Sequence, residues 1–291
     1  MPLVHMKPML KTAKAARYGI AAFNMIDYNS ARAIVDGAEE MNAPIIIQVS
    51  VKTIKLWSHK TLGSWVAALA ADADVPIALH LDHCKDLDVI KGCIDNGWTS
   101  VMFDGSADPF EENVKKSKQA YDIAMAAGVG LEAELGAIGG VEDDKFVAED
   151  EAILADVNEC LAFCKEMPEL AVFAPAIGTA HGDYKGEPKI AYDRLEKLTS
   201  IIDIPIALHG GTGLTDEQFT RCIQSGCAKV NISTMHKKHF VDGFCDVKTK
   251  EPPVKEPIPY IEAQYETMKA GVMDMIRTFG SEGKASQMKA A

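Results

Sequence analysis

The chain has 291 residues, of which 47% are hydrophobic, so it can bury one large core, and its length allows one or two domains. A formal net charge of −12 argues against general nucleic-acid binding, because that function needs a basic surface to displace counterions from phosphates. No apolar run approaches the roughly 18 residues that span a bilayer, and the N-terminal segment lacks the residue order of a secretory signal. Seven scattered cysteines, an odd number, fit free thiols in a reducing compartment. We therefore expect a cytoplasmic protein that binds neither nucleic acid nor membrane.

Eight short apolar segments follow one another along the chain and predict β-strands. They cover residues 19–23, 44–49, 76–81, 99–103, 129–135, 170–174, 204–208 and 227–232. The stretches between them carry apolar residues at helical spacing, as at Ala31, Ile34, Val35 and Ala38. This alternation predicts an α/β fold, a (β/α)8 TIM barrel whose strands are buried on both faces. An open doubly wound sheet is the alternative, although polar and glycine-rich residues follow nearly every predicted strand and do not gather at one switch point.

The organisation of the chain indicates one domain with a C-terminal addition. No internal repeat or linker suggests a second domain, so residues 1–291 are expected to fold together. The insertion over residues 136–151 is rich in glycine and acidic residues, which predicts a mobile lid after the fifth strand. Residues 248–259 contain four prolines and interrupt a helical extension over about residues 246–280. The small polar residues after Thr278 are expected to fray.

Three histidines, His83, His181 and His209, each follow a short apolar run. The carboxyl ends of barrel strands are where enzymes of this fold place their functional residues. Three imidazoles without a fourth protein ligand would suit a catalytic zinc that keeps one position open for substrate. Any one of these histidines alone is more often a hydrogen-bonded core residue, but three at the ends of different strands favour the metal site.

The order His80, Leu81, Asp82, His83 poses a geometric difficulty for that site. Alternate residues of an ideal strand face the same side, so His80 and Asp82 would point one way and His83 the other. Asp82 and His83 can both face the active site only if the strand has ended by Asp82 and the loop turns His83 inward. We expect that turn, and a structural or supporting role for His80.

Eight motifs lie at the ends of predicted strands: AFN (22–24), QVS (48–50), HLDH (80–83), MFDGS (102–106), LEAELGAIGGVED (131–143), GTAHGDYKG (178–186), LHGGTG (208–213) and KVNIST (229–234). In these motifs, their order and their spacing, the chain resembles the class II ketose-bisphosphate aldolases, most of all their tagatose-bisphosphate-type branch. The resemblance covers roughly residues 1–245. It implies a zinc-dependent lyase that cleaves a ketose 1-phosphate or 1,6-bisphosphate to dihydroxyacetone phosphate and an aldehyde. A homodimer or homotetramer is also implied.

The resemblance implies a role for each group of polar residues. His83, His181 and His209 would hold Zn²⁺, which acts as a Lewis acid for the enediolate. Glu134 and Asp104 match carboxylates that hold a second or displaced metal in relatives, or they could accept hydrogen bonds from histidine N–H groups. The implied catalytic residues are the general base Asp82, the lid acid Glu142, which would transfer the proton at C3, and Asn231, which would bind the enediolate oxygen.

A phosphate site is indicated by glycines and hydroxyl residues near the last strands. Gly210, Gly211 and Thr212 precede a predicted helix that begins near Thr215, so backbone N–H groups and the helix dipole could hold a dianion. Barrels often bind phosphate with the loops after strands seven and eight. The resemblance adds four further residues, Gly182, Lys185, Ser233 and Thr234, and a monovalent cation, Na⁺ or K⁺, near Gly182 and Gly210.

The aldehyde side departs from the family pattern. Relatives use an Asp-Pro-Arg element from a neighbouring subunit to bind the second phosphate, and the arginine position here holds Ile258. Asn24, Ser50 and Ser106 remain on the aldehyde side. The aldehyde product could therefore be unphosphorylated, carry another anion such as a sulfonate, as in 6-sulfofructose 1-phosphate, or be held by another cation such as Lys52.

Two other functions remain open at this point. A zinc-dependent TIM-barrel hydrolase would share the three histidines but would not explain the phosphate site together with the Gly-Gly lid. A non-catalytic sugar-phosphate-binding protein would keep the phosphate site but would need neither Asp82 nor Glu142.

Overall fold

The computed structural model describes residues 3–142, 145–147, 154–182, 188–250 and 253–288. Within these residues, eight parallel strands close a barrel in the order β1-β11-β10-β8-β5-β4-β3-β2. The strands are β1 (Ile20–Asn24), β2 (Ile45–Ser50), β3 (Ile77–Cys84), β4 (Ser100–Phe103), β5 (Gly130–Leu135), β8 (Val172–Pro175), β10 (Ile206–Leu208) and β11 (Cys227–Ile232). Each overlaps one predicted strand, so the predicted (β/α)8 barrel is confirmed.

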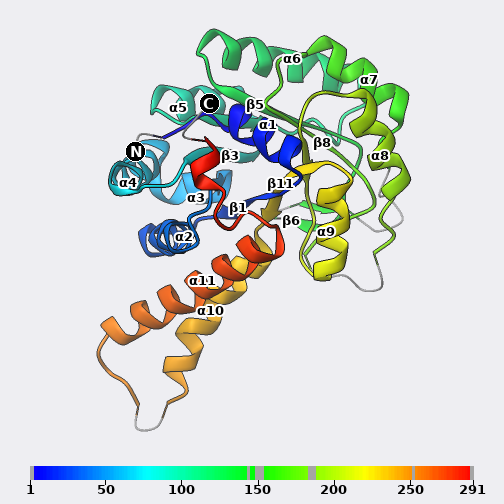
Figure 1. Ribbon diagram of the computed structural model, residues 1–291. Coiled ribbons are helices and arrows are strands. Elements are labelled where there is room, and N and C mark those ends of the chain that lie inside the picture. The colour runs from blue at the N-terminus through cyan, green and yellow to red at the C-terminus, as the bar shows by residue number, and fades with distance from the viewer. Residues whose placement is uncertain (1–2, 143–144, 148–153, 183–187, 251–252, 289–291) are drawn as a thin grey trace.

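Helices surround the barrel (Figure 1). They are α1 (Met6–Ala16), α2 (Tyr28–Glu40), α3 (Val51–Trp57), α4 (His59–Asp72), α5 (Leu87–Asp95), α6 (Phe110–Ala126), α7 (Val157–Glu166), α8 (Tyr192–Ile201), α9 (Asp216–Gln224), α10 (Thr234–Lys248) and α11 (Ile258–Thr278). Helix α1 precedes the first strand and was not predicted; its Met6, Met9 and Leu10 pack against residues of the barrel interior. No helix in the described part of the chain is long and apolar enough to cross a membrane.

On β2 and β3 the row of side chains that faces the barrel interior changes from apolar to polar along the strand. On β3 the row runs from Ala78 to His80 and Asp82, and on β2 it runs from Ile46 to Gln48, all of them buried. The lower, apolar members form one cluster with the residues of α1. Because every strand of a parallel barrel points the same way, the polar members gather at the carboxyl end.

A small second sheet forms at the carboxyl end of the barrel, where the lid was predicted. Strand β6 (Gly139–Glu142) pairs antiparallel with β7 (Lys145–Val147) and parallel with β9 (Ala180–His181). Gly140 lies directly opposite His181 in this register. The described part of the lid is therefore attached by strand pairing to a segment that carries one of the three histidines.

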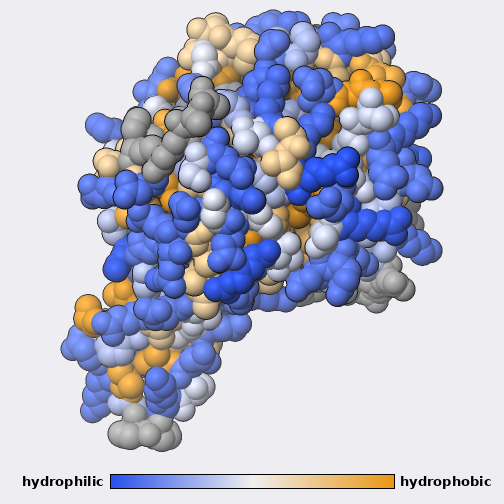
Figure 2. Space-filling model, in the orientation of Figure 1, coloured by the Kyte–Doolittle hydropathy of each residue, from blue (hydrophilic) through white to orange (hydrophobic). Residues whose placement is uncertain are grey.

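The last two long helices form a hairpin that projects away from the barrel (Figure 1). Apolar side chains are visible on this hairpin in Figure 2, and four of its residues are strongly exposed: Val241, Phe244, Ile258 and Ile261. The tail after Thr278 does not fray as expected, at least as far as Met288. Phe279 and Ala285 are buried, and the backbone N–H of Ala285 donates to Asn42.

His236 on α10 should lower the stability of the fold in acid. Both of its ring nitrogens are buried without a hydrogen-bond partner, and burial, aided by His239, lowers its pKa to about 3. Between about pH 6.5 and pH 3 the unfolded chain binds a proton that the folded chain does not, so this residue's contribution to the unfolding free energy falls as pH decreases.

We expect His236→Leu to raise the unfolding free energy by about 1–2 kcal/mol at pH 7, since it removes an unsatisfied polar group, and by more at pH 5. Urea denaturation at both pH values measures this, with the exposed His5→Leu as the control. Parallel pH dependence of His236→Leu and wild type would contradict the prediction.

Candidate active site and metal centre

His83, His181 and His209 converge at the carboxyl end of the barrel. They come from β3, from β9 and from the residue after β10. Their ring centroids lie 5.3 Å apart for His83 and His181, 4.8 Å for His83 and His209, and 6.2 Å for His181 and His209. One nitrogen from each ring lies within 4.8 Å of the others, a group that could hold a metal ion.

His83 reaches this site through a β-bulge and not through the end of the strand. Strand β3 continues to Cys84, so the expectation that it ends by Asp82 was wrong. Its register against β4 shifts between Leu81 and Cys84, where one extra residue is accommodated, and His83 has a φ of 41°. A left-handed residue within a bulge re-aims its side chain. Asp82 and His83 can therefore both face the carboxyl end of the barrel, as expected, but because of a bulge within β3 and not because the strand ends.

Asp82 is held by three amide side chains. Its Oδ2 accepts hydrogen bonds from Asn24 Nδ2 at 2.8 Å and Gln48 Nε2 at 3.3 Å, and its Oδ1 accepts one from Asn231 Nδ2 at 3.4 Å. Gln48 also donates to Asn24 Oδ1 at 2.7 Å. Asp82 is only 2% exposed, so these amides replace the water that a carboxylate would otherwise bind. Asn24, placed on the aldehyde side in the sequence analysis, contacts the candidate base directly.

A buried ion pair between Glu132 and Lys229 lies beside this network, and sequence reasoning missed both residues. Lys229 Nζ lies 2.8 Å from Glu132 Oε2 and donates to Asn231 Oδ1 at 2.7 Å. Burial disfavours the Glu132 carboxylate, but the Lys229 charge, the hydrogen bond of His209 and the nearby His80 outweigh it and hold the pKa of Glu132 well below its usual range. The sequence did carry a signal for this pair. Glu132 precedes Glu134 by two residues and Lys229 precedes Asn231 by two, so each shares a strand face with a residue already assigned to the site.

His80 packs against the same ion pair and stays neutral. Its Nδ1 lies 3.0 Å from Ser100 Oγ, and its Nε2 lies 3.2 Å from Glu132 Oε2 without hydrogen-bond geometry. Burial and the Lys229 charge lower the pKa of His80 more than Glu132 raises it. The structural or supporting position expected for His80 is what the structure has.

His209 lies between two carboxylates. Its Nε2 is 2.7 Å from Glu132 Oε1, and its Nδ1 is 3.0 Å from Glu134 Oε2, a close approach without hydrogen-bond geometry. Burial disfavours the imidazolium, but the two carboxylates raise the pKa of His209 to about 9. A cation is therefore favoured here, whether it is a proton or a metal ion.

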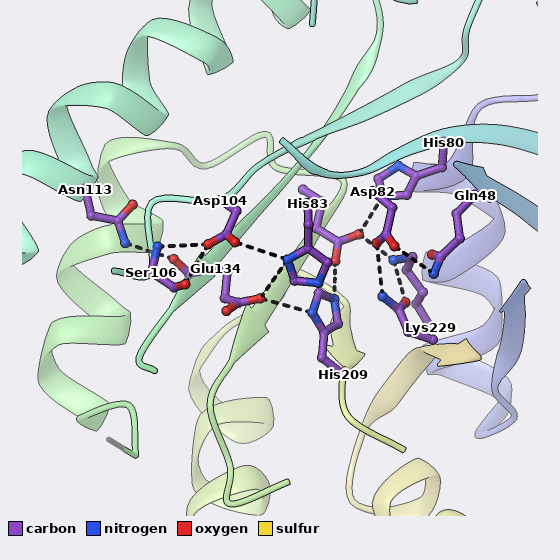
Figure 3. Close-up of polar contacts among 12 residues, drawn as sticks. Gln48, His80, Asp82, His83, Asp104, Ser106, Asn113, Glu134, His209 and Lys229 are labelled. Carbon is purple, nitrogen blue, oxygen red and sulfur yellow. Dashed lines mark hydrogen bonds and ion pairs between the residues drawn. The ribbon is translucent and has the colours of Figure 1, made fainter. Parts of the chain in front are cut away.

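The carboxylates Asp104 and Glu134 adjoin His83. Asp104 Oδ2 lies 3.2 Å from His83 Nδ1, and Glu134 Oε2 lies 3.9 Å from the same atom. The three residues form a second group whose ligand atoms lie within 4.8 Å of one another. The hydrogen-bond distance of Asp104 fits the acceptor role, and the group as a whole fits the alternative of a second metal position. Ser106 donates to Asp104 Oδ1 at 2.6 Å, so it lies on the Asp104 side of His83 (Figure 3).

Helix α10, and not α9, offers the open N-terminus for an anion. Thr215 caps α9 in a reciprocal capping box with Gln218, and Asp216 and Glu217 follow in its first turn. The capping box therefore occupies the N–H groups of Thr215 and Gln218, and the two acidic residues repel anions. Helix α10 has no side-chain cap at Ser233 and no acidic residue in its first turn, which begins at Thr234.

The glycine loop between β10 and α9 packs closely against neighbouring segments. Gly210 has a φ of 67°, and a Cβ there would lie 2.6 Å from the backbone oxygen of Ala180. A Cβ at Gly211 would lie 2.8 Å from the Phe219 ring. Gly182, with a φ of 79°, follows His181. Lys185 lies outside the described residues, and for Glu142 only the backbone, within β6, is described.

The remaining predicted residues are Ser50, Thr212 and Ile258. Ser50, 4% exposed, pairs in register with Asp82 and caps α3 by accepting from the N–H of Thr53. Thr212 is half-buried in the glycine loop. Ile258 begins α11 at the far end of the projecting hairpin and is 54% exposed. A residue at that position is remote from its own barrel.

The comparisons with known proteins agree on one family. A family model described as fructose-bisphosphate aldolase class-II matches residues 4–284. The chain is 40% identical over 290 residues to a fructose-bisphosphate aldolase of Geobacillus stearothermophilus, covering 99% of this chain and 100% of that one. It is 38% identical over 285 residues to a sulfofructosephosphate aldolase of Alkalicoccus urumqiensis, covering 98% and 99%.

Among solved structures, the YdjI aldolase from Escherichia coli K12 matches with a TM-score of 0.86 at 26% identity, covering 97% of this chain and 99% of that one. The fold, the length and the family model therefore agree. The protein is an aldolase, a carbon–carbon lyase, and the chain belongs to the class II fructose-bisphosphate aldolase family.

Proposed function

We propose that this aldolase cleaves a ketose that carries a phosphate on C1, with Asp82 as the general base beside a zinc held by His83, His181 and His209. The observation that carries the proposal is the bulge in β3, which presents a carboxylate and an imidazole from consecutive residues to one site. The products are dihydroxyacetone phosphate and an aldehyde. A hydrolase would not need the amides that hold Asp82, and a binding protein would not need Asp82 itself.

The residues fit a zinc ion. Tetrahedral zinc with Zn–N bonds of about 2.0–2.1 Å needs nitrogens about 3.4 Å apart, within reach of the three imidazoles by small shifts. His209 Nδ1 is buried without a hydrogen bond. Glu132 contacts the other nitrogen of His209, and Asp104 contacts Nδ1 of His83, as supporting carboxylates do. When bound, zinc supplies a Lewis acid for the charge that develops on the ketone and C3 oxygens. Glu134 and Asp104 could also hold a second metal.

In the proposed mechanism, Asp82 takes the proton from the C4 hydroxyl while the C3–C4 bond breaks. Asn24 and Asn231 orient its two oxygens, and Asn231 also donates to the enediolate oxygen. Glu142, carried by β6, returns a proton to C3. In the condensation direction the same groups act in reverse.

The phosphate on C1 would bind at the N-terminus of α10. Ser233 and Thr234 contribute hydroxyl and N–H groups there, and Gly210, Gly211 and Thr212 contribute backbone N–H groups from the adjacent loop. Gly182 and Lys185 complete the pocket, with Na⁺ or K⁺ bound to nearby carbonyl groups. We further propose a single-domain, cytoplasmic homodimer or homotetramer, for which the exposed apolar residues of the α10–α11 hairpin are suitable contacts.

We propose that the end of the substrate that becomes the aldehyde does not need to carry a phosphate. The relatives above include a fructose-bisphosphate and a sulfofructosephosphate aldolase at nearly equal identity, so overall similarity does not choose between a phosphate and a sulfonate. Ile258 at the arginine position cannot bind either anion. Ser50 and Ser106 remain as neutral donors toward this end.

Activity should depend on bound zinc. Chelation should abolish cleavage, and one Zn²⁺ per subunit should restore it, because the zinc would supply the Lewis acid that stabilises the enediolate charge. His181→Ala should weaken zinc binding, measured by chelator competition, while the exposed His5→Ala should not. Full activity in metal-free protein, or trapping of substrate by borohydride, would contradict the zinc assignment.

Asp82→Asn should retain zinc and dihydroxyacetone phosphate but cut carbon–carbon cleavage by about 10²-fold or more, as the loss of a general base does. Glu142→Ala should instead slow proton exchange at C3 of dihydroxyacetone phosphate, followed by NMR in deuterium oxide. The two variants thus separate the two proton transfers. Loss of zinc from Asp82→Asn would show that Asp82 is a ligand or structural residue.

Fructose 1,6-bisphosphate should not be the best substrate. Ile258→Arg should raise kcat/KM for 1,6-bisphosphates more than for 1-phosphates, because a bidentate arginine and phosphate pair can contribute a few kcal/mol. Fructose 1,6-bisphosphate, tagatose 1,6-bisphosphate, fructose 1-phosphate and 6-sulfofructose 1-phosphate are the substrates to compare, with Val241→Arg as a charge-matched control on the same hairpin. A wild-type preference of about 10³-fold for a 1,6-bisphosphate would show that another residue replaces the arginine.

A further inference from the structure

The ion pair between Glu132 and Lys229 lies in the interior of the barrel, where neither residue is exposed to solvent. The two side chains come from β5 and β11, which are not neighbours in the barrel. A buried ion pair is seldom more stabilising than apolar residues of the same size, since both charges lose their hydration. Ala174 and Ala207 show that apolar side chains fill the interior nearby. Stability alone therefore does not account for this pair.

Glu132 determines which nitrogen of His209 faces the metal site. A carboxylate can only accept hydrogen bonds, so the His209 Nε2 atom 2.7 Å from Glu132 Oε1 must carry a proton. That leaves Nδ1 as the only nitrogen of His209 that can bind a metal. His83 is held separately, because its Nδ1 lies 3.2 Å from Asp104 Oδ2, a carboxylate oxygen that accepts its hydrogen bond.

Lys229 determines which way the Asn231 amide points. An ammonium group can only donate, so the Asn231 atom 2.7 Å from Lys229 Nζ must be the carbonyl oxygen Oδ1. The amide nitrogen Nδ2 then faces the other way, toward Asp82 Oδ1 at 3.4 Å. With Oδ1 turned toward Asp82 instead, the amide would present a lone pair to a carboxylate and to the developing enediolate.

We propose that Glu132 and Lys229 are a pair of positioning residues that link the metal ligand His209 to the base Asp82 through Asn231. One ion pair thereby fixes the ligating nitrogen of His209 at one end and the amide donor of Asn231 at the other. Opposite charges are required, because Glu132 must be a pure acceptor and Lys229 a pure donor. The inference rests on the proposed zinc site and base.

The test is the double variant Glu132→Gln with Lys229→Met, which keeps the interior neutral and similar in volume. Glutamine can donate to His209 Nε2 as well as accept from it, and methionine cannot orient Asn231. We expect the dissociation constant for Zn²⁺, measured by chelator competition, to rise about 10- to 100-fold. At saturating zinc, kcat for cleavage should still fall at least tenfold, because Asn231 is no longer oriented.

The control makes the same two chemical changes in an ion pair between α2 and α11: Glu40→Gln with Lys269→Met, whose charged atoms lie 2.6 Å apart. It should leave zinc affinity and kcat at wild-type values. A merely structural role for Glu132 and Lys229 would change only the melting temperature, and zinc affinity and kcat within twofold of wild type would overturn the inference. If the double variant does not fold, zinc affinity is measured on Glu132→Gln alone. Weaker zinc binding would then support the inference, and affinity within twofold of wild type would overturn it. Failure of the wild type to bind zinc or to cleave would instead refute the proposed function.

Discussion

The bulge in β3 is the constraint on which the rest of the candidate site depends. In a regular strand Asp82 and His83 would lie on opposite faces, one inside the barrel and one against the outer helices. The extra residue and the left-handed backbone at His83 allow Asp82 and His83 to face the same end of the barrel. Histidine tolerates such a backbone only at some cost in conformational energy, which the neighbouring hydrogen bond to Asp104 helps to offset. The proposed base and a candidate metal ligand are then consecutive residues of one short segment.

Once that segment is fixed, the interior of the barrel must balance its charges without water. Three carboxylates, Asp82, Glu132 and Glu134, are each at most 2% exposed. Amide side chains donate hydrogen bonds to Asp82, and Lys229 forms an ion pair with Glu132. His209 lies close to both Glu132 and Glu134. The raised pKa of His209 shows that this corner of the site favours positive charge, which is the electrostatic requirement for a zinc ion. The uncapped N-terminus of α10 offers N–H groups to the proposed phosphate, so an acidic chain would not need a lysine cluster there.

The sequence was sufficient for the barrel but not for its irregularities. The strands could be predicted because apolar residues run almost continuously through them, and the three histidines because each follows such a run. The bulges at His83 and near Ala228 could not, since they depend on register against neighbouring strands. Glu132 and Lys229 were overlooked because their contact forms only when the barrel closes. The tail after Thr278 was expected to fray on composition alone, yet Phe279 is buried and its backbone oxygen accepts from Gly19.

The pairing of β6 with β9 extends the same principle to the lid. Gly140 lies opposite His181 with a φ of 102°, and any Cβ there would collide with the backbone of His181. Glycine is therefore needed at this position for close approach as well as for flexibility. Glu142 lies two residues further along β6, so the proposed acid is carried by a strand that is aligned directly on a candidate metal ligand. Asp82 adjoins His83 along the chain, and Glu142 lies in the strand whose Gly140 is paired with His181. Each proposed proton-transfer group is thus connected through the backbone to a candidate metal ligand, Asp82 to His83 on β3 and Glu142 to His181 on β9.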